Sequence, residues 1–226
     1  MKKIYFGLIL IVIIIGIAVF FWPKNNSQKE TPIILEISRP EVSGNQAAEP
    51  IPPSVPKANG FQPPIIRAGE RVAKKPFGIF ITPKNSPVQP ERFYGYHSGS
   101  DFEVFSEELN LDVEVKAICS GELKMKKTAS GYGGLAVEAC EINGGPITVI
   151  YGHLKLSSIA ANIGENINVG DTLGILGAGY SSETSGERKH LHLGIHKGAD
   201  LNILGYVQNK ENLSDWIDPC LYACGK

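Results

Sequence analysis

Histidine and aspartate residues in this chain are spaced so that several of them meet the requirements of a metal site. Three of the five histidines lie in the stretch ERKHLHLGIH, which ends at His196. His190 and His192 stand two residues apart, and in a β-strand residues at that spacing point to the same side. Imidazole is the commonest metal ligand, but an exposed polar strand face has the same pattern, so further residues must converge on this strand.

A second motif, YGYHSGSDF, places His97 four residues before Asp101. Its serines and glycines disfavour a helix, and in an extended chain residues at an even spacing return to one face. Together with His192, the second histidine of the H-x-H pair, this motif supplies two imidazoles and one carboxylate, which fit a catalytic zinc ion with an open fourth position. An iron oxygenase centre uses the same donors and is the alternative at this point.

Two further histidines are expected to do proton chemistry beside the metal. His153 follows the apolar run VIYG and is expected at the rim of a sheet, and His190 is the first histidine of the H-x-H pair. If these two also bound the metal, no coordination position would remain for water. We therefore expect His153 and His190 to accept a proton from the metal-bound water and to stabilise charge on a carbonyl oxygen.

The elements that must position these groups are short β-strands. Runs with alternating apolar residues recur after Phe61, separated by Gly, Asn and Pro: FGIFI, LDVEVKAI, GELKMKK, GLAVEAC, ITVIYGHL, DTLGILG and LHLGIH. This pattern is typical of an antiparallel all-β domain, which we place at residues 65–226. Helical periodicity is nearly absent there, with one short helical turn expected in LSDWIDP.

The N-terminus predicts a membrane anchor. The segment Ile4–Trp22 has no charged residue and, as a helix, reaches roughly 28 Å, near the thickness of a bilayer core. Its aromatic end, FFW, favours an uncleaved signal anchor over 1–22. Lys2 and Lys3 favour a cytoplasmic N-terminus, so we expect a single-pass protein of the cell membrane whose remaining chain is extracytoplasmic, in the periplasm or on the outer face.

A proline-rich linker is expected at residues 23–64. Nine of the fifteen prolines fall in this range, among Ser, Asn, Gln and Glu. Such a composition favours extended chain without a packed core, which holds the domain away from the membrane surface.

The four cysteines fit an oxidising, exported location. Cys119 and Cys140 end two predicted strands that flank a turn near Gly131, so a disulfide between them is plausible. Cys220 and Cys224 are spaced for a second bridge within one helical turn. Zinc binding by the four cysteines is the weaker interpretation, because no C-x-x-C spacing occurs. Buried free thiols are the remaining alternative.

The charge distribution excludes a nucleic-acid-binding footprint. The formal net charge is -1, and the chain has no dense run of Lys and Arg. We therefore predict no nucleic-acid partner. Nothing in the sequence indicates a protein partner.

In their order along the chain, the motifs HSGSD, YGHL and HLH resemble the lysostaphin and LytM type of zinc metallopeptidase, peptidase family M23. The resemblance runs from about Arg67 to Tyr222 and includes VKAICSGEL, GYGG, IGENINVGDTLGILG and WIDPCLY. It implies a compact twisted β-sheet with a narrow substrate groove and an endopeptidase that cuts the peptides of bacterial peptidoglycan. It also implies one zinc ion on His97, Asp101 and His192, with His153 and His190 as the catalytic pair.

This chain departs from the family pattern around the H-x-H motif. Where the family usually has S-T-G-x-H-L-H-F-E, the sequence reads TSGERKHLHLGI. We expect Arg188 and Lys189 to be either a solvated basic pair or contacts for a substrate carboxylate, and we include Tyr151 among the candidate substrate contacts. His196 is expected to be a surface histidine outside the site.

A non-catalytic envelope adaptor of the same fold, which activates other wall hydrolases, is the competing function. Such relatives typically lack metal ligands, whereas this chain retains all five site residues. The sequence therefore favours the enzyme.

Overall fold

The computed structural model describes residues 60–225 of the chain. The predicted anchor at 1–22 and nearly all of the predicted linker at 23–64 lie outside the described residues, and both stay predictions. Within residues 60–225, no helix has the length and apolar character needed to cross a membrane.

The described residues form twelve short strands and six 3-10 helices, so the fold is all-β, as the sequence predicts. The strands are β1 (Phe80–Ile81), β2 (Gly95–His97), β3 (Gly99–Glu103), β4 (Glu114–Lys116), β5 (Gly121–Ala129), β6 (Gly133–Ile142), β7 (Gly145–Gly152), β8 (Asn166–Ile167), β9 (Thr172–Ile175), β10 (His190–Lys197), β11 (Tyr206–Val207) and β12 (Trp216–Ile217). The 3-10 helices are η1 (Ala68–Glu70), η2 (Ser106–Glu108), η3 (Leu156–Ser158), η4 (Ser182–Thr184), η5 (Lys210–Asp215) and η6 (Pro219–Leu221).

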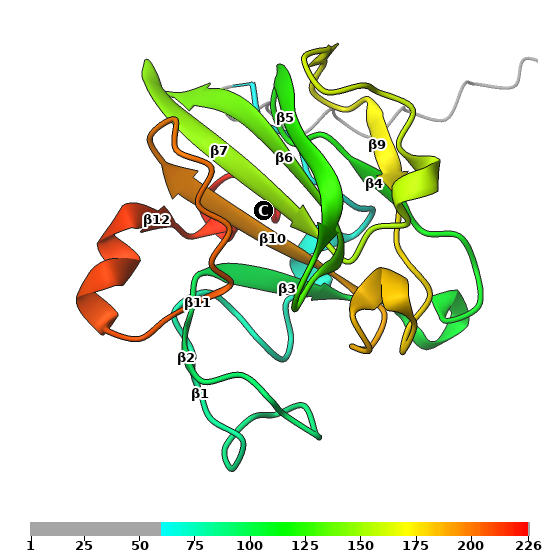
Figure 1. Cartoon of the computed structure of the whole chain (residues 1–226), viewed down its shortest axis with the longest axis vertical. Helices are drawn as coiled ribbons and strands as arrows, with labels where there is room; N and C mark the ends of the chain where they lie inside the picture. Colours follow the sequence, from blue (N-terminus) through cyan, green and yellow to red (C-terminus); the bar gives the residue numbers. More distant parts are fainter. Residues whose placement is uncertain (1–59, 226) are drawn as a thin grey trace, which may run out of the picture. The chain divides into compact units, whose positions relative to one another are not determined.

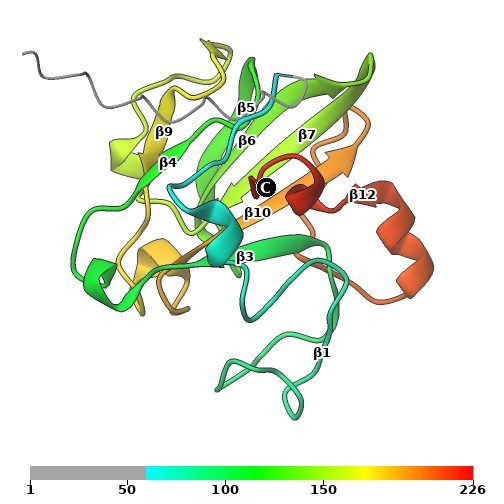
Figure 2. The same ribbon diagram turned by 180° about the vertical axis from the view of Figure 1, so that it is seen from behind.

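One antiparallel sheet dominates the domain. Its strand order is β12-β10-β7-β6-β5-β8, and β3 also pairs with β10. Figure 1 shows β5, β6, β7 and β10 side by side, with β3 next to the first half of β10, and Figure 2 shows the same layer from behind. Two smaller sheets, β1-β2-β11 and β4-β9, complete the fold.

The two faces of this sheet carry different hydrophobic clusters. Along β10, Leu191, Leu193 and Ile195 are buried in the larger cluster, which also contains Tyr151. A smaller cluster on the other face contains Leu135, Val137, Ile150 and Trp216. Because side chains alternate along a strand, the even-numbered residues of β10, including its histidines, are placed on the face of the smaller cluster.

The β5–β6 hairpin turns where the sequence predicts, with Ala129 opposite Gly133. Gly131 and Gly133 have φ angles of 84° and 69°, in the left-handed region that glycine adopts without steric cost. Tyr132 is held between these two glycines at the turn, and its ring packs into the smaller cluster.

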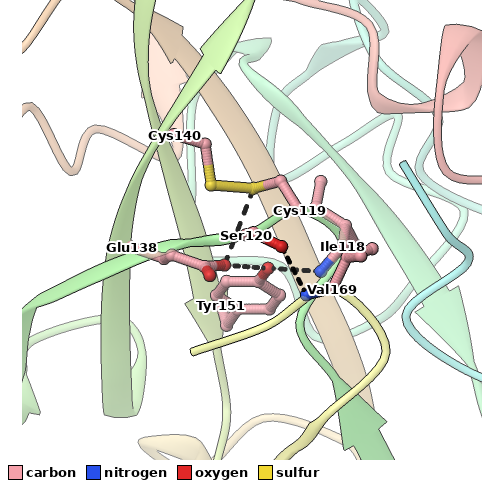
Figure 3. Close-up of a disulfide and its surroundings, with 7 residues drawn as sticks. All are labelled: Ile118, Cys119, Ser120, Glu138, Cys140, Tyr151 and Val169. Atoms are coloured by element: carbon pink, nitrogen blue, oxygen red, sulfur yellow. Dashed lines mark hydrogen bonds between the residues drawn. A yellow bond between two sulfur atoms is a disulfide. The ribbon is translucent and has the colours of Figure 1, made fainter. Parts of the chain in front are cut away.

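Both predicted disulfides are confirmed. Cys119 is bonded to Cys140 and Cys220 to Cys224, with no free cysteine among the described residues. The first bridge closes the start of β5 onto β6 beside Glu138 and Tyr151, as Figure 3 shows.

The folded domain includes residues near the end of the predicted linker range. Phe61 is only 6% exposed, and its ring lies 5.2 Å from that of Tyr222. Gln62 N donates a hydrogen bond to Ile118 O. These contacts tie the chain to the domain from Phe61 onward.

A buried carboxyl group lies beneath the first disulfide. Glu138 is inaccessible to solvent, and Oε2 accepts a hydrogen bond of 2.8 Å from the hydroxyl of Tyr151. That hydroxyl also accepts a hydrogen bond from Ile118 N, and Cys119 Sγ lies 3.7 Å from Glu138 Oε2. Burial raises the pKa of Glu138 from 4.5 to about 7, although the bond from Tyr151 acts in the opposite direction.

We predict that Glu138→Gln removes a pH-dependent loss of stability. Because the folded-state pKa is raised, the stability contributed by this group is fully present below about pH 4.5 and is lost as the pH rises through about 7. The loss amounts to about 3 kcal/mol. Denaturant unfolding of both proteins, with disulfides intact, measures the free energy of unfolding at pH 5 and pH 8. Between these pH values, this free energy should fall more for the wild type than for Glu138→Gln. An equal fall in the two proteins would contradict the prediction.

Candidate active site

The pairing of β3 with β10 brings the two predicted motifs together. In this antiparallel register, Asp101 lies opposite His192 and Glu103 opposite His190. His97 ends β2, and a single residue, Ser98, separates it from the start of β3. Residues separated in the sequence by about ninety positions therefore form one buried cluster.

Three candidate metal ligands converge within this cluster. His97 Nε2 lies 3.0 Å from His192 Nδ1 and 3.3 Å from Asp101 Oδ1, and His192 Nδ1 lies 3.1 Å from the same oxygen. Donors bound tetrahedrally to zinc at about 2.0–2.1 Å are separated by about 3.3 Å, so this spacing fits one zinc ion. The structure thus groups His97, Asp101 and His192 as the sequence predicts.

A glycine makes room for the histidine ligand. A Cβ atom on Gly99 would lie 2.8 Å from the Cε1 and Nε2 atoms of His192 and 2.4 Å from Leu193 O. The H-x-G-x-D arrangement therefore lets the backbone of β3 approach the imidazole closely.

The surroundings keep the two histidine ligands in a metal-binding form. His97 Nδ1 lies 3.3 Å from Pro76 O, a carbonyl that can only accept, which favours the tautomer with a lone pair on Nε2. Burial lowers the pKa of His192 to about 4, although the hydrogen bond to Asp101 acts to raise it. A neutral imidazole is the form that binds metal.

The other carboxylate oxygen of Asp101, Oδ2, lies close to two side chains that can donate hydrogen bonds. Arg188 Nη2 and His190 Nε2 lie 3.0 Å and 3.3 Å from Asp101 Oδ2. Burial alone would raise the pKa of Asp101, but His190 and His97 outweigh it and hold this pKa well below its usual range. Asp101 therefore stays ionised, with Oδ1 left for the metal.

Arg188 is itself anchored by Glu103. Its Nε atom lies 3.0 Å and 2.9 Å from the two carboxylate oxygens, and its Nη2 atom also contacts Oε1. Burial acts to lower the pKa of Arg188, but Glu103 and Asp101 outweigh it and raise this pKa. The guanidinium group of Arg188 thus links Asp101, which belongs to the ligand cluster, to Glu103, which lies outside that cluster.

His153 and His190 form a second pair beside the ligand cluster. Their ring centroids are 4.3 Å apart. His153 follows β7 with a φ of 65°, a left-handed conformation uncommon for residues other than glycine, and its carbonyl accepts a hydrogen bond from Gly177 N. Burial and the neighbouring His190 lower the pKa of His153 well below its usual range, so this imidazole stays neutral.

A cavity of about 300 Å³ opens over these groups, in the position of the predicted groove. Asp101, His153, His190 and His192 line it. The sequence predictions did not include several other residues that line the cavity, among them Lys75, Phe93, Tyr94, Tyr132, Leu204 and Tyr206. Of these residues, Tyr132 could have been found from the sequence, since it is the tyrosine of the GYGG motif.

Two of the predicted substrate contacts are wrong. Tyr151 is completely buried on the opposite face of the sheet, where its hydroxyl bonds to Glu138. Lys189 is buried outside this cavity, and its amine donates to the carbonyl oxygens of Glu108 and Leu109. Arg188 does line the cavity, but its guanidinium group already forms ion pairs with Asp101 and Glu103.

His196 is not a surface residue, contrary to the prediction. It is 8% exposed, its ring lies 4.9 Å from that of Trp216, and its Nε2 atom lies 3.3 Å from Asn202 Nδ2. The pairing of β12 with the end of β10 covers it. As predicted, it does not belong to the ligand cluster.

A second grouping, Cys119, Glu138 and Cys140, also has donor atoms close together. Both of its sulfur atoms are joined in a disulfide, and only a thiolate is a good metal ligand. The grouping is therefore a structural element of the core.

The fold and the site together define an all-β domain with two histidines and one aspartate converging beside a histidine pair. The model for peptidase family M23 matches residues 95–203, which contain all five of these residues. Residues 95–203 therefore form a domain of the peptidase family M23 type. No curated protein matches the sequence.

Several solved structures are similar to the domain. The catalytic domain of lysostaphin from Staphylococcus simulans is 20% identical, with a TM-score of 0.46, and the match covers 69% of this chain and 93% of that one. CbpA from L. salivarius REN is 23% identical, with a TM-score of 0.47, and the match covers 72% of this chain and 94% of that one. A zinc-containing peptidase from Vibrio cholerae is 20% identical, with a TM-score of 0.40 and coverage of 61% and 37%.

We predict that Arg188→Met weakens zinc binding about tenfold or more. The substitution removes the group that holds Asp101 Oδ2, and loss of a partner to a metal ligand typically costs 10–100-fold in affinity. Competition against a chromogenic chelator measures this affinity. Lys189→Met is the matched control, because its amine contacts only backbone carbonyls, and it should retain wild-type affinity. Equal affinities for Arg188→Met and the wild type would contradict the assigned role.

Proposed function

We propose that the protein is a zinc-dependent endopeptidase that hydrolyses stem peptides or cross-links of bacterial peptidoglycan. The observation that carries this proposal is the convergence of three ligand atoms beside the His153–His190 pair, which lines a cavity together with Asp101 and His192. The match of residues 95–203 to peptidase family M23 supports peptide hydrolysis. The predicted N-terminal anchor is consistent with a domain that works on the wall from the extracytoplasmic face of the membrane.

The donor set favours zinc. Two imidazoles and one carboxylate leave a fourth position free, which is the arrangement of catalytic zinc sites. When each of the three donor atoms presents the lone pair that metal binding requires, the atoms are close enough to repel one another, so a shared cation would stabilise them. When bound, zinc polarises the scissile carbonyl and makes a bound water more acidic.

His153 is suited to act as the general base. Burial keeps its ring neutral, and its Nδ1 atom is buried with no hydrogen-bond partner among residues 60–225. A neutral imidazole with a free nitrogen accepts the proton of the attacking water.

His190 is suited to act as the proton donor. Its Nδ1 atom lies 2.8 Å from Arg188 O, and its Nε2 atom lies 3.3 Å from Asp101 Oδ2. Both partners are acceptors, so a ring that carries a proton on each nitrogen satisfies both. His190 then stabilises negative charge on the carbonyl oxygen and protonates the leaving amine. The pair thus divides base and acid between two neighbouring imidazoles.

The test is the digestion of purified peptidoglycan by the full-length chain in detergent, loaded with zinc. We expect new peptide fragments with free amino termini, and their sequences identify the bond. A chelator should abolish the reaction, and added zinc should restore it.

Three variants separate the roles of the site residues. His153→Ala and His190→Ala should retain zinc and lose at least about 100-fold in rate, because a positioned proton-transfer group contributes 10²–10⁴-fold. His97→Ala should lose the zinc itself. Metal analysis of aerobically purified wild-type protein checks zinc against iron. A folded, zinc-bound protein that cleaves no wall preparation would rule out the enzyme and favour the adaptor.

A further inference from the structure

We propose that the hydroxyl of Tyr132 is a further catalytic group that donates a hydrogen bond to the carbonyl oxygen of the scissile peptide as negative charge develops on it. This inference rests on the proposed peptidase function. It assigns a role to a residue outside the ligand cluster and the histidine pair.

Unpartnered polar atoms gather around the cavity. Within residues 60–225, six buried side-chain nitrogen or oxygen atoms have no hydrogen-bond partner. Four of them belong to residues that line this one cavity: Tyr132, His153, Arg188 and His192. Buried polar groups are normally paired, so this concentration indicates a place where a polar ligand completes the bonding.

Tyr132 stands next to both groups of histidines. Its ring centroid lies 5.3 Å from that of His192, edge-on, and 6.0 Å from that of His153. Tyr132 is only 8% exposed, although it lines the cavity. A carbonyl oxygen bound between the metal ligands and the histidine pair is therefore within reach of this side chain.

The side chain of Tyr132 packs closely against two glycines, whose missing side chains leave the space that it fills. A Cβ atom on Gly152 would lie 2.5 Å from Cδ1 of Tyr132, and one on Gly205 would lie 2.9 Å from its hydroxyl oxygen. The backbone is fixed as well, because Tyr132 N donates to Ala129 O in the hairpin turn. A donor held in place before the substrate arrives needs little reorganisation during the reaction.

The chemistry of the group suits a donor. Burial, with a smaller contribution from the charge of Asp101, raises the pKa of Tyr132, so the phenol remains protonated. Tyr206 also lines the cavity, but its hydroxyl already lies 3.3 Å from Lys75 Nζ. Tyr94 lines the cavity too, but it is 54% exposed and therefore belongs to the rim. Tyr132 is the tyrosine of this cavity whose hydroxyl is buried and has no hydrogen-bond partner within residues 60–225.

The test compares Tyr132→Phe with the full-length wild type, both loaded with zinc. We expect kcat/KM for peptidoglycan peptides to fall about 100-fold, as for the loss of an oxyanion donor. Zinc affinity and thermal stability should be unchanged or slightly higher, because the variant removes a buried unpaired hydroxyl. Tyr180→Phe, which removes the same atom from a residue that is 80% exposed, is the control and should keep wild-type activity.

Binding of inorganic phosphate, a tetrahedral oxyanion, gives a second readout that does not need catalysis. Calorimetry should show about tenfold weaker binding by zinc-loaded Tyr132→Phe than by the wild type. If the wild type cleaves no wall but this difference appears, the proposed function fails and the role of Tyr132 stands. Unchanged kcat/KM, equal phosphate affinity, absence of phosphate binding by the wild type, or a parallel loss of zinc would each overturn the inference.

Discussion

The antiparallel pairing of β3 with β10 is the constraint on which the site depends. Its register sets Asp101 opposite His192, and β10 also pairs with β7 along its other edge. A slip by one residue would turn every side chain of β10 to the other face, because side chains alternate along a strand. The apolar residues Leu191, Leu193 and Ile195 prevent that slip, because it would exchange them with histidines in the core. Hydrophobic burial thereby determines where the imidazoles point.

Electrostatics in the site follow from that packing. Asp101 uses one oxygen toward His97 and His192 and the other toward Arg188 and His190, so a single carboxylate connects the ligand cluster to the histidine pair. Removing its charge from water is unfavourable, and the surrounding donors compensate for it. In contrast, Glu138 is buried with one hydroxyl donor and no cation, and its pKa is raised. Two buried carboxyl groups of one sheet thus have opposite protonation behaviour.

Sequence patterns predicted the regular parts of the domain well. The alternating runs overlap β1, β4 to β7, β9 and β10, and the hairpin turn lies at Gly131 as predicted. Short elements without their own periodicity, such as β11 and β12, were missed, because two-residue strands are defined by their partners. His196 was expected on the surface, since a polar residue near a strand end gives no sign of a covering strand such as β12.

By itself, the sequence determined the types and spacing of the chemical groups: His97 and Asp101 four apart, His190 and His192 two apart, and His153 at the end of an apolar strand. Those relations are local, because the alternation of a strand carries them. Only the tertiary structure decided that Arg188 bonds to Asp101 and Glu103, that Tyr151 faces the core, and that Tyr132 faces the cavity. These outcomes depend on strand register and on which face of the sheet each neighbour covers, and the contacts join residues that are far apart in the chain.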